Sequence, residues 1–220
     1  MRKHLATFDT QADAETCRRR MLAERTRPQW CRSFNGSPRL FEDSGRRLPF
    51  VKDVIHAATL GAFPEDVIVL TNADICFAPS FDRQINAAAT NCCYAHRMEF
   101  PSLDTILSDQ EIAKGIKYPG IDLFAFTSGW WSVHSDEFPD MVMGAEAWDL
   151  CLWELMKRHS ESHEVIELEN VIYHESHDST WCRPENISTL PSQIHNLGLA
   201  REFLKGQPDQ LALLIPNRPT

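Results

Sequence analysis

A short apolar run that ends in two polar residues constrains the fold of this chain more than any other feature. Residues 67–70 are three β-branched residues and a leucine, and Asn72 and Asp74 follow them closely. The run lacks alternation and is too short for a buried helix, which predicts a strand buried on both faces. Residues two apart on an extended chain project to one face, so Asn72 and Asp74 are expected to converge on one ligand.

Strand and helix patterns alternate along the first third of the chain. Residues 5–8 and 30–34 favour strands, 12–25 favour a helix, and 48–58 favour an amphipathic helix that leads into the apolar run. This alternation predicts an α/β fold, a Rossmann-like three-layer α/β/α sandwich with a mostly parallel central sheet. Ligands bind at the carboxyl ends of such strands, although Asn and Asp are also common turn and capping residues there.

The remainder of the chain continues the pattern with longer connections. Helices are expected at 79–89, from 138 to about 159 and at 193–203, strands at 92–96 and 118–127, and a polar connection at 101–119. A chain of 220 residues is long enough for one well-buried domain. We therefore expect a single domain over 1–220.

Charge and cysteine content narrow the classes of partner. The net charge is −9, with eleven Lys and Arg against six Asp and Glu in residues 1–50 and a strongly acidic remainder. An acidic chain is not expected to bind nucleic acid, whereas its basic N-terminal quarter can either face ligand phosphates or form a solvated helix. The chain has seven cysteines without a CxxC pair, which predicts reduced thiols. It has no apolar stretch typical of a membrane span or signal peptide, and both observations predict a cytoplasmic location.

The region around the apolar run resembles the DxD region of GT-A type nucleotide-sugar glycosyltransferases. The resemblance rests on a helix that begins near Leu48, the strand, the motif Asn72-Ala73-Asp74 and the Ile-x-Phe that follows. It implies a divalent metal, Mn or Mg, held by Asp74 and Asn72 against the diphosphate of the donor. Asn72 replaces the first Asp of the family pattern, and its amide oxygen can bind a metal without adding negative charge.

The resemblance also implies residues on the donor side and late in the chain. Thr7, Lys52 and Asp53 are candidates for contacts with the donor, with a solvated position as the alternative for Lys52 and Asp53. His174 or His177 is the candidate for a late histidine that reaches the metal, since imidazole is a good ligand for manganese-like ions. A surface or core position is the alternative for either histidine.

Further candidates belong to the acceptor side. Glu146 and Asp149 resemble the acidic motif that begins a helix in GT-A enzymes and supplies the general base in inverting members, although the helix dipole alone also favours them. Asp122, Arg97, Trp130 and Trp131 are expected beside the substrate. Aromatic faces are the usual platform for a sugar ring, and an ordinary core position is the alternative for the two tryptophans.

These observations predict a metal-dependent glycosyltransferase, hexosyltransferase-like, that transfers a sugar from a nucleotide-diphosphate donor to a hydroxyl of a glycan or other acceptor. Residues 1–100 would form the nucleotide-donor half, 101–190 the acceptor half, and 191–220 a closing helix and tail. One alternative is a metal-dependent hydrolase that uses Asp74, His174, His177 and Asp178. The other is a non-catalytic sugar-nucleotide-binding domain in which Asn72 marks the loss of the metal.

Overall fold

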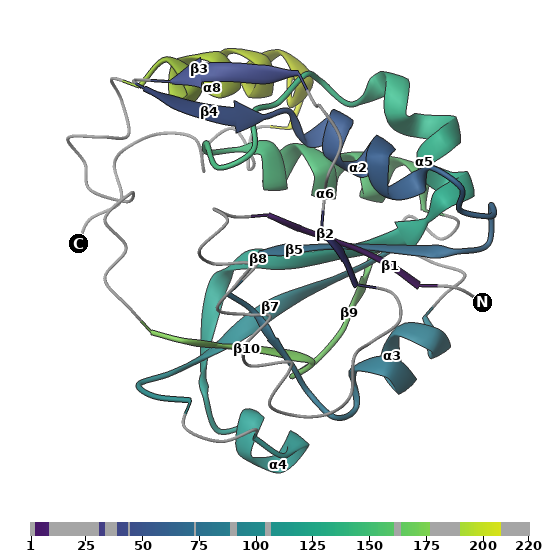
Figure 1. Ribbon diagram of the computed structural model, residues 1–220, viewed down its shortest axis with the longest axis vertical. Helices are drawn as coiled ribbons and strands as arrows, with labels where there is room; N and C mark the ends of the chain where they lie inside the picture. The colour runs from purple at the N-terminus through teal and green to yellow at the C-terminus, as the bar shows by residue number, and fades with distance from the viewer. Residues whose placement is uncertain are drawn as a thin grey trace.

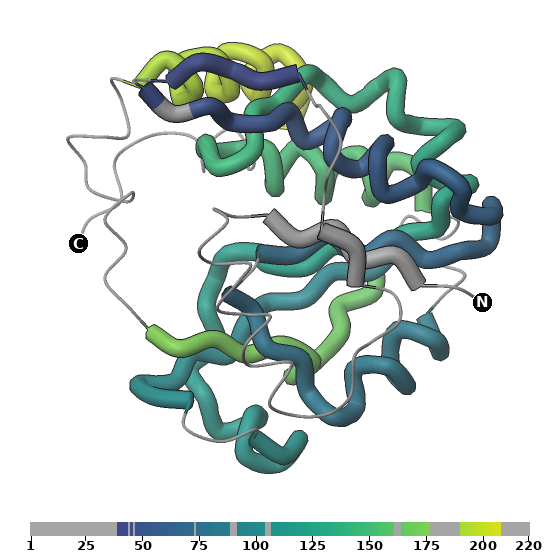
Figure 2. Tube along the Cα trace, viewed as in Figure 1, coloured from purple at the N-terminus to yellow at the C-terminus, as the bar shows by residue number. Residues whose placement is uncertain are grey.

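The computed structural model describes residues 3–8, 31–33, 39–43, 45–72, 74–88, 92–103, 107–160, 164–176 and 190–207. These residues are coloured in Figure 1, and Figure 2 traces the course of the chain in the same view. Among the sequence predictions, the helix at 12–25 and the residues His177 and Asp178 lie outside the described residues.

The centre of the molecule is a mixed β-sheet in the order β2-β1-β5-β8-β7-β10-β6, with β9 paired to β7 (Figure 1). Its strands are β1 (Lys3–Phe8), β2 (Cys31–Ser33), β5 (Val67–Asn72), β6 (Cys76–Phe77), β7 (Cys93–Phe100), β8 (Ile116–Thr127), β9 (Ile166–Glu167) and β10 (Ile172–Glu175).

The direction of the strands differs from the prediction. β1 is parallel to β2 and β5, and β7 is parallel to β9 and β10. β8 is antiparallel to both of its neighbours, β5 and β7, and β6 is antiparallel to β10. The α/β class is confirmed, but the sheet is mixed rather than mostly parallel, because the chain turns back after β7 and inserts β8 between two strands that precede it.

Helices lie on both faces of the sheet. They are α2 (Val51–Thr59), α3 (Phe81–Ala87), α4 (Asp109–Ile112), α5 (Ser128–His134), the 3₁₀ turn η1 (Ser135–Glu137), α6 (Trp148–His159) and α8 (Pro191–Phe203). A separate antiparallel hairpin, β3 (Leu40–Asp43) and β4 (Arg46–Pro49), lies beside α8 in Figure 1. Among the described helices, none has the length and apolar character needed to cross a membrane.

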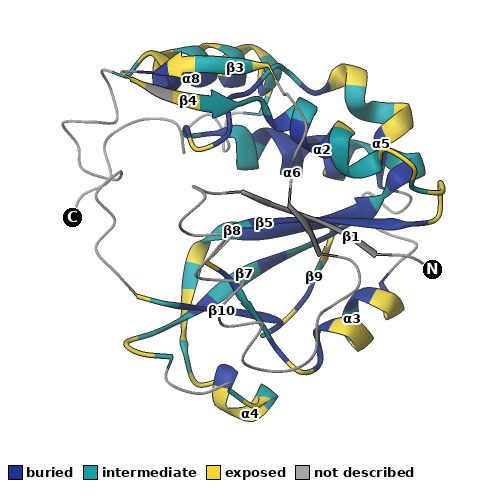
Figure 3. Cartoon of the chain, viewed as in Figure 1, coloured by how far each residue is buried: buried dark blue, intermediate teal, exposed yellow. Residues whose placement is uncertain are grey.

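The apolar run in β5 is buried on both faces, as predicted. Ile68 and Leu70 belong to the core cluster that contains residues of α2, α6 and α8, whereas Val67 and Val69 belong to the cluster that contains Phe81 of α3. Figure 3 shows β5 and the adjoining part of β8 in the buried colour between these layers. Burial of each such side chain contributes about 1.5 to 3 kcal/mol, so the core fixes the position of the strand.

Several element boundaries differ from the sequence prediction. The helix expected from residue 48 begins only at Val51, because Pro49 still belongs to the β3–β4 hairpin. The helix expected from residue 138 begins only at Trp148. The segment before it consists mostly of turns and bends around Val142, which forms an isolated β-bridge with Phe50 and exchanges hydrogen bonds with the Asn196 side chain. The expected connection at 101–119 contains α4 and the first residues of β8.

Candidate functional site

Polar side chains from three neighbouring strands meet where β5 ends. Thr71 pairs with Leu123 in the β5–β8 register, which brings Asn72 beside Asp122. The Asn72 side-chain amide donates a hydrogen bond to Asp122 Oδ1 at 2.8 Å, and Arg97 Nη1, from β7, donates to the same oxygen at 2.9 Å. The structure therefore brings together three predicted site residues on the C-terminal edge of a buried strand, which is where ligands bind in α/β folds.

Asp122 is a buried carboxyl group that is only partly compensated. Its residue is 7% exposed, and its Oδ2 atom has no hydrogen-bond partner among the described residues. Burial raises the pKa of Asp122 to about 6, against the opposing effect of the Arg97 guanidinium. The charges of Asp149 and Asp74 raise this pKa further, which places both carboxylates within electrostatic reach of Asp122.

Arg97 is held in position by contacts on two sides. Its guanidinium donates to Glu99 Oε1 from Nη2 at 2.9 Å and from Nε at 3.2 Å, and it lies over the Tyr118 ring at 3.7 Å from the ring centroid. Sequence analysis missed Glu99 and Tyr118 as supports for Arg97. The signal was available in part, since residues 97 and 99 are two apart on a strand and project to one face.

His174 reaches the DxD-like motif from the far end of the chain. β10 pairs with β6 so that Tyr173 faces Cys76, which brings the next residue, His174, beside the segment that contains Asp74. His174 Nε2 lies 3.1 Å from Asp74 Oδ2 across 100 residues of sequence. The histidine side chain is 4% exposed and the Asp74 carboxylate is 40% exposed, so the buried ring holds a solvent-accessible carboxylate.

The two candidate bases occupy different surroundings. Asp149 lies in the first turn of α6, whose first residue, Trp148, packs against Phe124 of β8. Glu146 precedes the helix, and its backbone is held by α8 through a hydrogen bond from its N–H to Gln193 Oε1 at 2.8 Å. The charge of Asp149 raises the pKa of Asp122, whereas Glu146 is not among the causes given for that shift.

The other residues predicted to contact the donor are Asp53, Lys52 and Thr7, and they do not join the cluster of side chains at the end of β5. Asp53 accepts hydrogen bonds from Arg39, and Lys52 Nζ lies 3.8 Å from Asp140, so both belong to a surface ion cluster at the start of α2. Thr7 pairs with Thr71 in the β1–β5 register, one strand away from the site.

The predicted aromatic platform is at the opposite end of the sheet. Trp130 and Trp131 follow Thr127, which pairs with Val67 at the start of β5, whereas the site lies at the end of that strand. Trp131 is 1% exposed and packs between Phe126 and Phe138. The core position considered as the alternative thus describes Trp131, because its ring has almost no surface for a ligand.

Asp74, Asp122 and His174 at the end of β5 are of the residue types that bind Mg or Mn, and Arg97 balances part of their charge. Among the described residues, the His, Cys, Asp and Glu ligand atoms that lie within 4.8 Å of one another in a group of three are those of His134, Glu137 and His159, so the side chains at the end of β5 do not form a closed metal site of this kind. Oxygen donors with an excess of negative charge are the ligands that hard cations prefer, and manganese also accepts imidazole. Asp122 Oδ2, which has no hydrogen-bond partner among the described residues, is one more oxygen that such an ion would satisfy.

Comparison of the chain with models of protein families, with curated proteins and with solved structures finds no match. The arrangement of the side chains therefore carries the functional argument.

Proposed function

We propose that this protein is a glycosyltransferase of the three-layer GT-A type, which transfers a sugar from a nucleotide-diphosphate donor to an acceptor hydroxyl with the help of Mn or Mg. One observation carries the proposal. The DxD-like motif contacts a late histidine and one further carboxylate at the end of a buried central strand, through Asp74 with His174 and Asn72 with Asp122.

The proposed roles follow from burial and charge. Asp74, Asn72 and His174 would hold the metal, which neutralises the charge that develops on the leaving diphosphate. Asp122 and Arg97 would keep the end of β5 in a fixed position beneath the donor, because both are nearly buried and joined at 2.9 Å. Asp149, at the start of α6, would take the proton of the acceptor hydroxyl if the reaction inverts configuration.

Thermal melting against a panel of nucleotide diphosphates and nucleotide sugars, with and without manganese, tests the proposal. A ligand that binds only the folded state stabilises it by about 2.7 kcal/mol at a hundredfold excess over Kd. We expect a manganese-dependent rise in the melting temperature with one nucleotide, which would also identify the donor base. A panel without any such shift would contradict the proposal.

The matched variant is Asp74→Ala, with Glu65→Ala as its control. The Asp74 side chain is 40% exposed, and Glu65 is also exposed. Asp74 follows the end of β5, whereas Glu65 precedes its start. We expect Asp74→Ala to abolish metal-dependent donor binding with little loss of fold stability, and Glu65→Ala to change neither. A large drop in melting temperature with donor affinity retained would make Asp74 a structural residue.

The contact between Asp74 and His174 also fits the metal-dependent hydrolase considered above, since one carboxylate and one imidazole are typical ligands of catalytic zinc. The same melting panel with zinc added, together with a measurement of sugar release from the bound donor, separates the transferase, the hydrolase and the binding domain. Stabilisation by zinc that Asp74→Ala removes, without any nucleotide effect, would favour the hydrolase, and nucleotide binding without turnover would favour the binding domain.

A further inference from the structure

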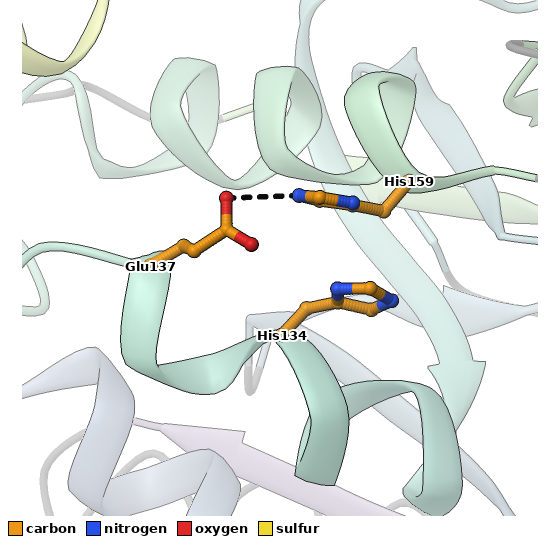
Figure 4. A group of neighbouring side chains, drawn as sticks. All are labelled: His134, Glu137 and His159. Atoms are coloured by element: carbon orange, nitrogen blue, oxygen red, sulfur yellow. Dashed lines mark hydrogen bonds and ion pairs between the residues drawn. The ribbon is translucent and has the colours of Figure 1, made fainter.

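Two histidines and a glutamate, residue types that bind metals, lie together away from the end of β5. His134 is the last residue of α5, Glu137 is in the 3₁₀ turn η1 that follows, and His159 is the last residue of α6. Figure 4 shows the two imidazole rings lying one over the other, with the Glu137 carboxylate extending toward them. The ring centroids are 4.0 Å apart, and His159 Nε2 is 2.9 Å from Glu137 Oε2.

The spacing of the three side chains suits a small cation. One ligand atom from each residue lies within 4.8 Å of the others. Donor atoms about 2.0 to 2.1 Å from a tetrahedral zinc ion lie about 3.3 Å from one another. The two imidazole planes are 19° apart, so the side chains rotate out of their stacked arrangement to direct both ring nitrogens at one ion. We propose that His134, Glu137 and His159 bind a divalent transition-metal ion, for which Zn²⁺ is the appropriate probe.

The backbone at this site is already fixed. Trp130 Nε1 donates a hydrogen bond to the His159 carbonyl oxygen at 3.2 Å, which joins the end of α6 to α5. The C-terminal ends of both helices meet there, and the partial negative charge at a helix C-terminus favours a cation. Only side-chain torsions therefore change when the ion binds, which keeps the entropic cost of binding small.

The neighbouring basic side chains of α6 are engaged elsewhere. Lys157 Nζ lies over the Trp153 ring at 5.3 Å, and Arg158 binds Glu154 and the Phe203 carbonyl oxygen. Neither interaction involves Glu137, so these two residues do not neutralise its carboxylate through these contacts. Two imidazoles and one carboxylate select zinc and similar borderline ions over Mg or Ca, which prefer sites made of oxygen atoms.

This site is distinct from the proposed donor site. Asp149 and His159 are ten residues apart on one helix, α6, which corresponds to about 15 Å along its axis. A metal at His159 would therefore connect α5, η1 and α6 without touching the end of β5. Glu137 is half-exposed, so solvent water can complete the coordination.

Zinc titration of the full chain, without a polyhistidine tag and after treatment with a chelator, tests the proposal. Binding is measured by competition with a chromogenic chelator, and Co²⁺ is used as a second probe because its visible absorption reports a tetrahedral site. We expect one zinc ion per chain at this site and weakening of about 100-fold or more in Glu137→Gln, His134→Gln and His159→Gln. The control is His56→Gln, an exposed histidine of α2, which should bind as the unmodified chain does.

Glu137→Gln is the decisive variant because its side chain is 51% exposed, so the fold does not depend on it. Unchanged zinc affinity in this variant, with an unchanged melting temperature, would overturn the proposal. Zinc binding that is lost in Asp74→Ala but retained in Glu137→Gln would place the ion at the donor site and overturn it equally. Zinc binding lost in Glu137→Gln and retained in Asp74→Ala supports this site, whether or not a nucleotide binds.

Discussion

Two clusters in this protein each combine an arginine with two carboxylates, yet their ionisation differs. At the start of α2, Arg39 binds Asp53 at 2.8 Å and Asp140 at 3.0 Å, and the arginine side chain is 54% exposed. Hydrogen bonds from Arg39 lower the pKa of both carboxyl groups. At the end of β5, Arg97 binds Asp122 at the same kind of distance, but both side chains are nearly buried and the pKa of Asp122 is raised.

The difference shows what burial does to an ion pair. In the surface cluster the attraction between charges exceeds a small desolvation cost, so every group keeps its charge. In the buried cluster desolvation exceeds the effect of Arg97, and neighbouring carboxylates add repulsion. A carboxyl group held against its ionisation is typical of functional sites, whereas a compensated surface cluster is typical of structural ones. This is why the function that we propose is placed at the end of β5 and not at Asp53 or Lys52.

The largest expected effect comes from Arg97→Ala. Removal of the guanidinium leaves the buried Asp122 without its charged partner, so the free energy of unfolding should fall by about 3 kcal/mol near neutral pH. Urea denaturation measures the loss. The loss of unfolding free energy should be smaller near pH 5, where Asp122 becomes protonated. An equal loss at both pH values would show that the lost packing of Arg97 on Tyr118 dominates.

Asp122→Asn should give an intermediate, pH-dependent effect. The pKa of Asp122 is about 6 in the folded protein and 3.8 is its ordinary value, so the folded state holds the proton more tightly. The stability that this provides is complete below pH 3.8 and is lost as the pH rises through 6. Relative to Asp122→Asn, the unmodified chain should lose about 1 kcal/mol between about pH 5 and 7.5.

Asp53→Asn is the matched control for that pH series. The pKa of Asp53 is lowered by Arg39, so its contribution to stability is present above its ordinary pKa and is lost only as the pH falls toward its folded value. The stability difference between the unmodified chain and Asp53→Asn should stay constant over the range in which Asp122 titrates. A similar slope for both variants would remove the distinction between the two clusters.

The smallest expected effect is that of Arg39→Ala. Exposed ion pairs contribute about 0 to 1 kcal/mol each and are screened by salt, so the loss in unfolding free energy should be about 1 kcal/mol and should shrink at high ionic strength. Urea denaturation at low and high salt measures both. A loss as large as that of Arg97→Ala would mean that the ion pairs of Arg39 at the start of α2 are a major contribution to the stability of the fold.

Local sequence signals predicted most of what positions the site. The buried run at 67–70, the polar residues after it and the histidine on a late strand follow from apolar pattern and residue type. The structure brings Asn72 and Asp74, through Asp122 and His174, into one cluster. The buried run and the polar residues after it depend on residues close together in the chain, which is why the pattern was sufficient for them. The contacts with Asp122 and His174 join residues 50 and 100 positions apart and follow from the strand pairing.

The direction of β8 was not predictable in the same way. Residues 123–126 are buried on both faces, and such a run has the same pattern in a parallel and an antiparallel setting. Gly115 and Pro119 suggested a connection that ends at residue 119. Pro119 instead lies within β8 where its pairing with β7 is irregular, between the partners of His96 and Met98, and such irregularities tolerate proline. The site at His134 was missed because His159 resembled an exposed residue at a helix end.

The position of β8 also determines the order in which the strands of the sheet can assemble during folding. β8 is formed later in the chain than β5 and β7, yet it is the strand that lies between them. Among the described strands, β1 and β5 on one side and β7 and β10 on the other are connected in the sheet only through it. The two parts can therefore join only after residues 116–127 have been synthesised and inserted, so folding of the sheet depends on contacts between distant residues and should be slow.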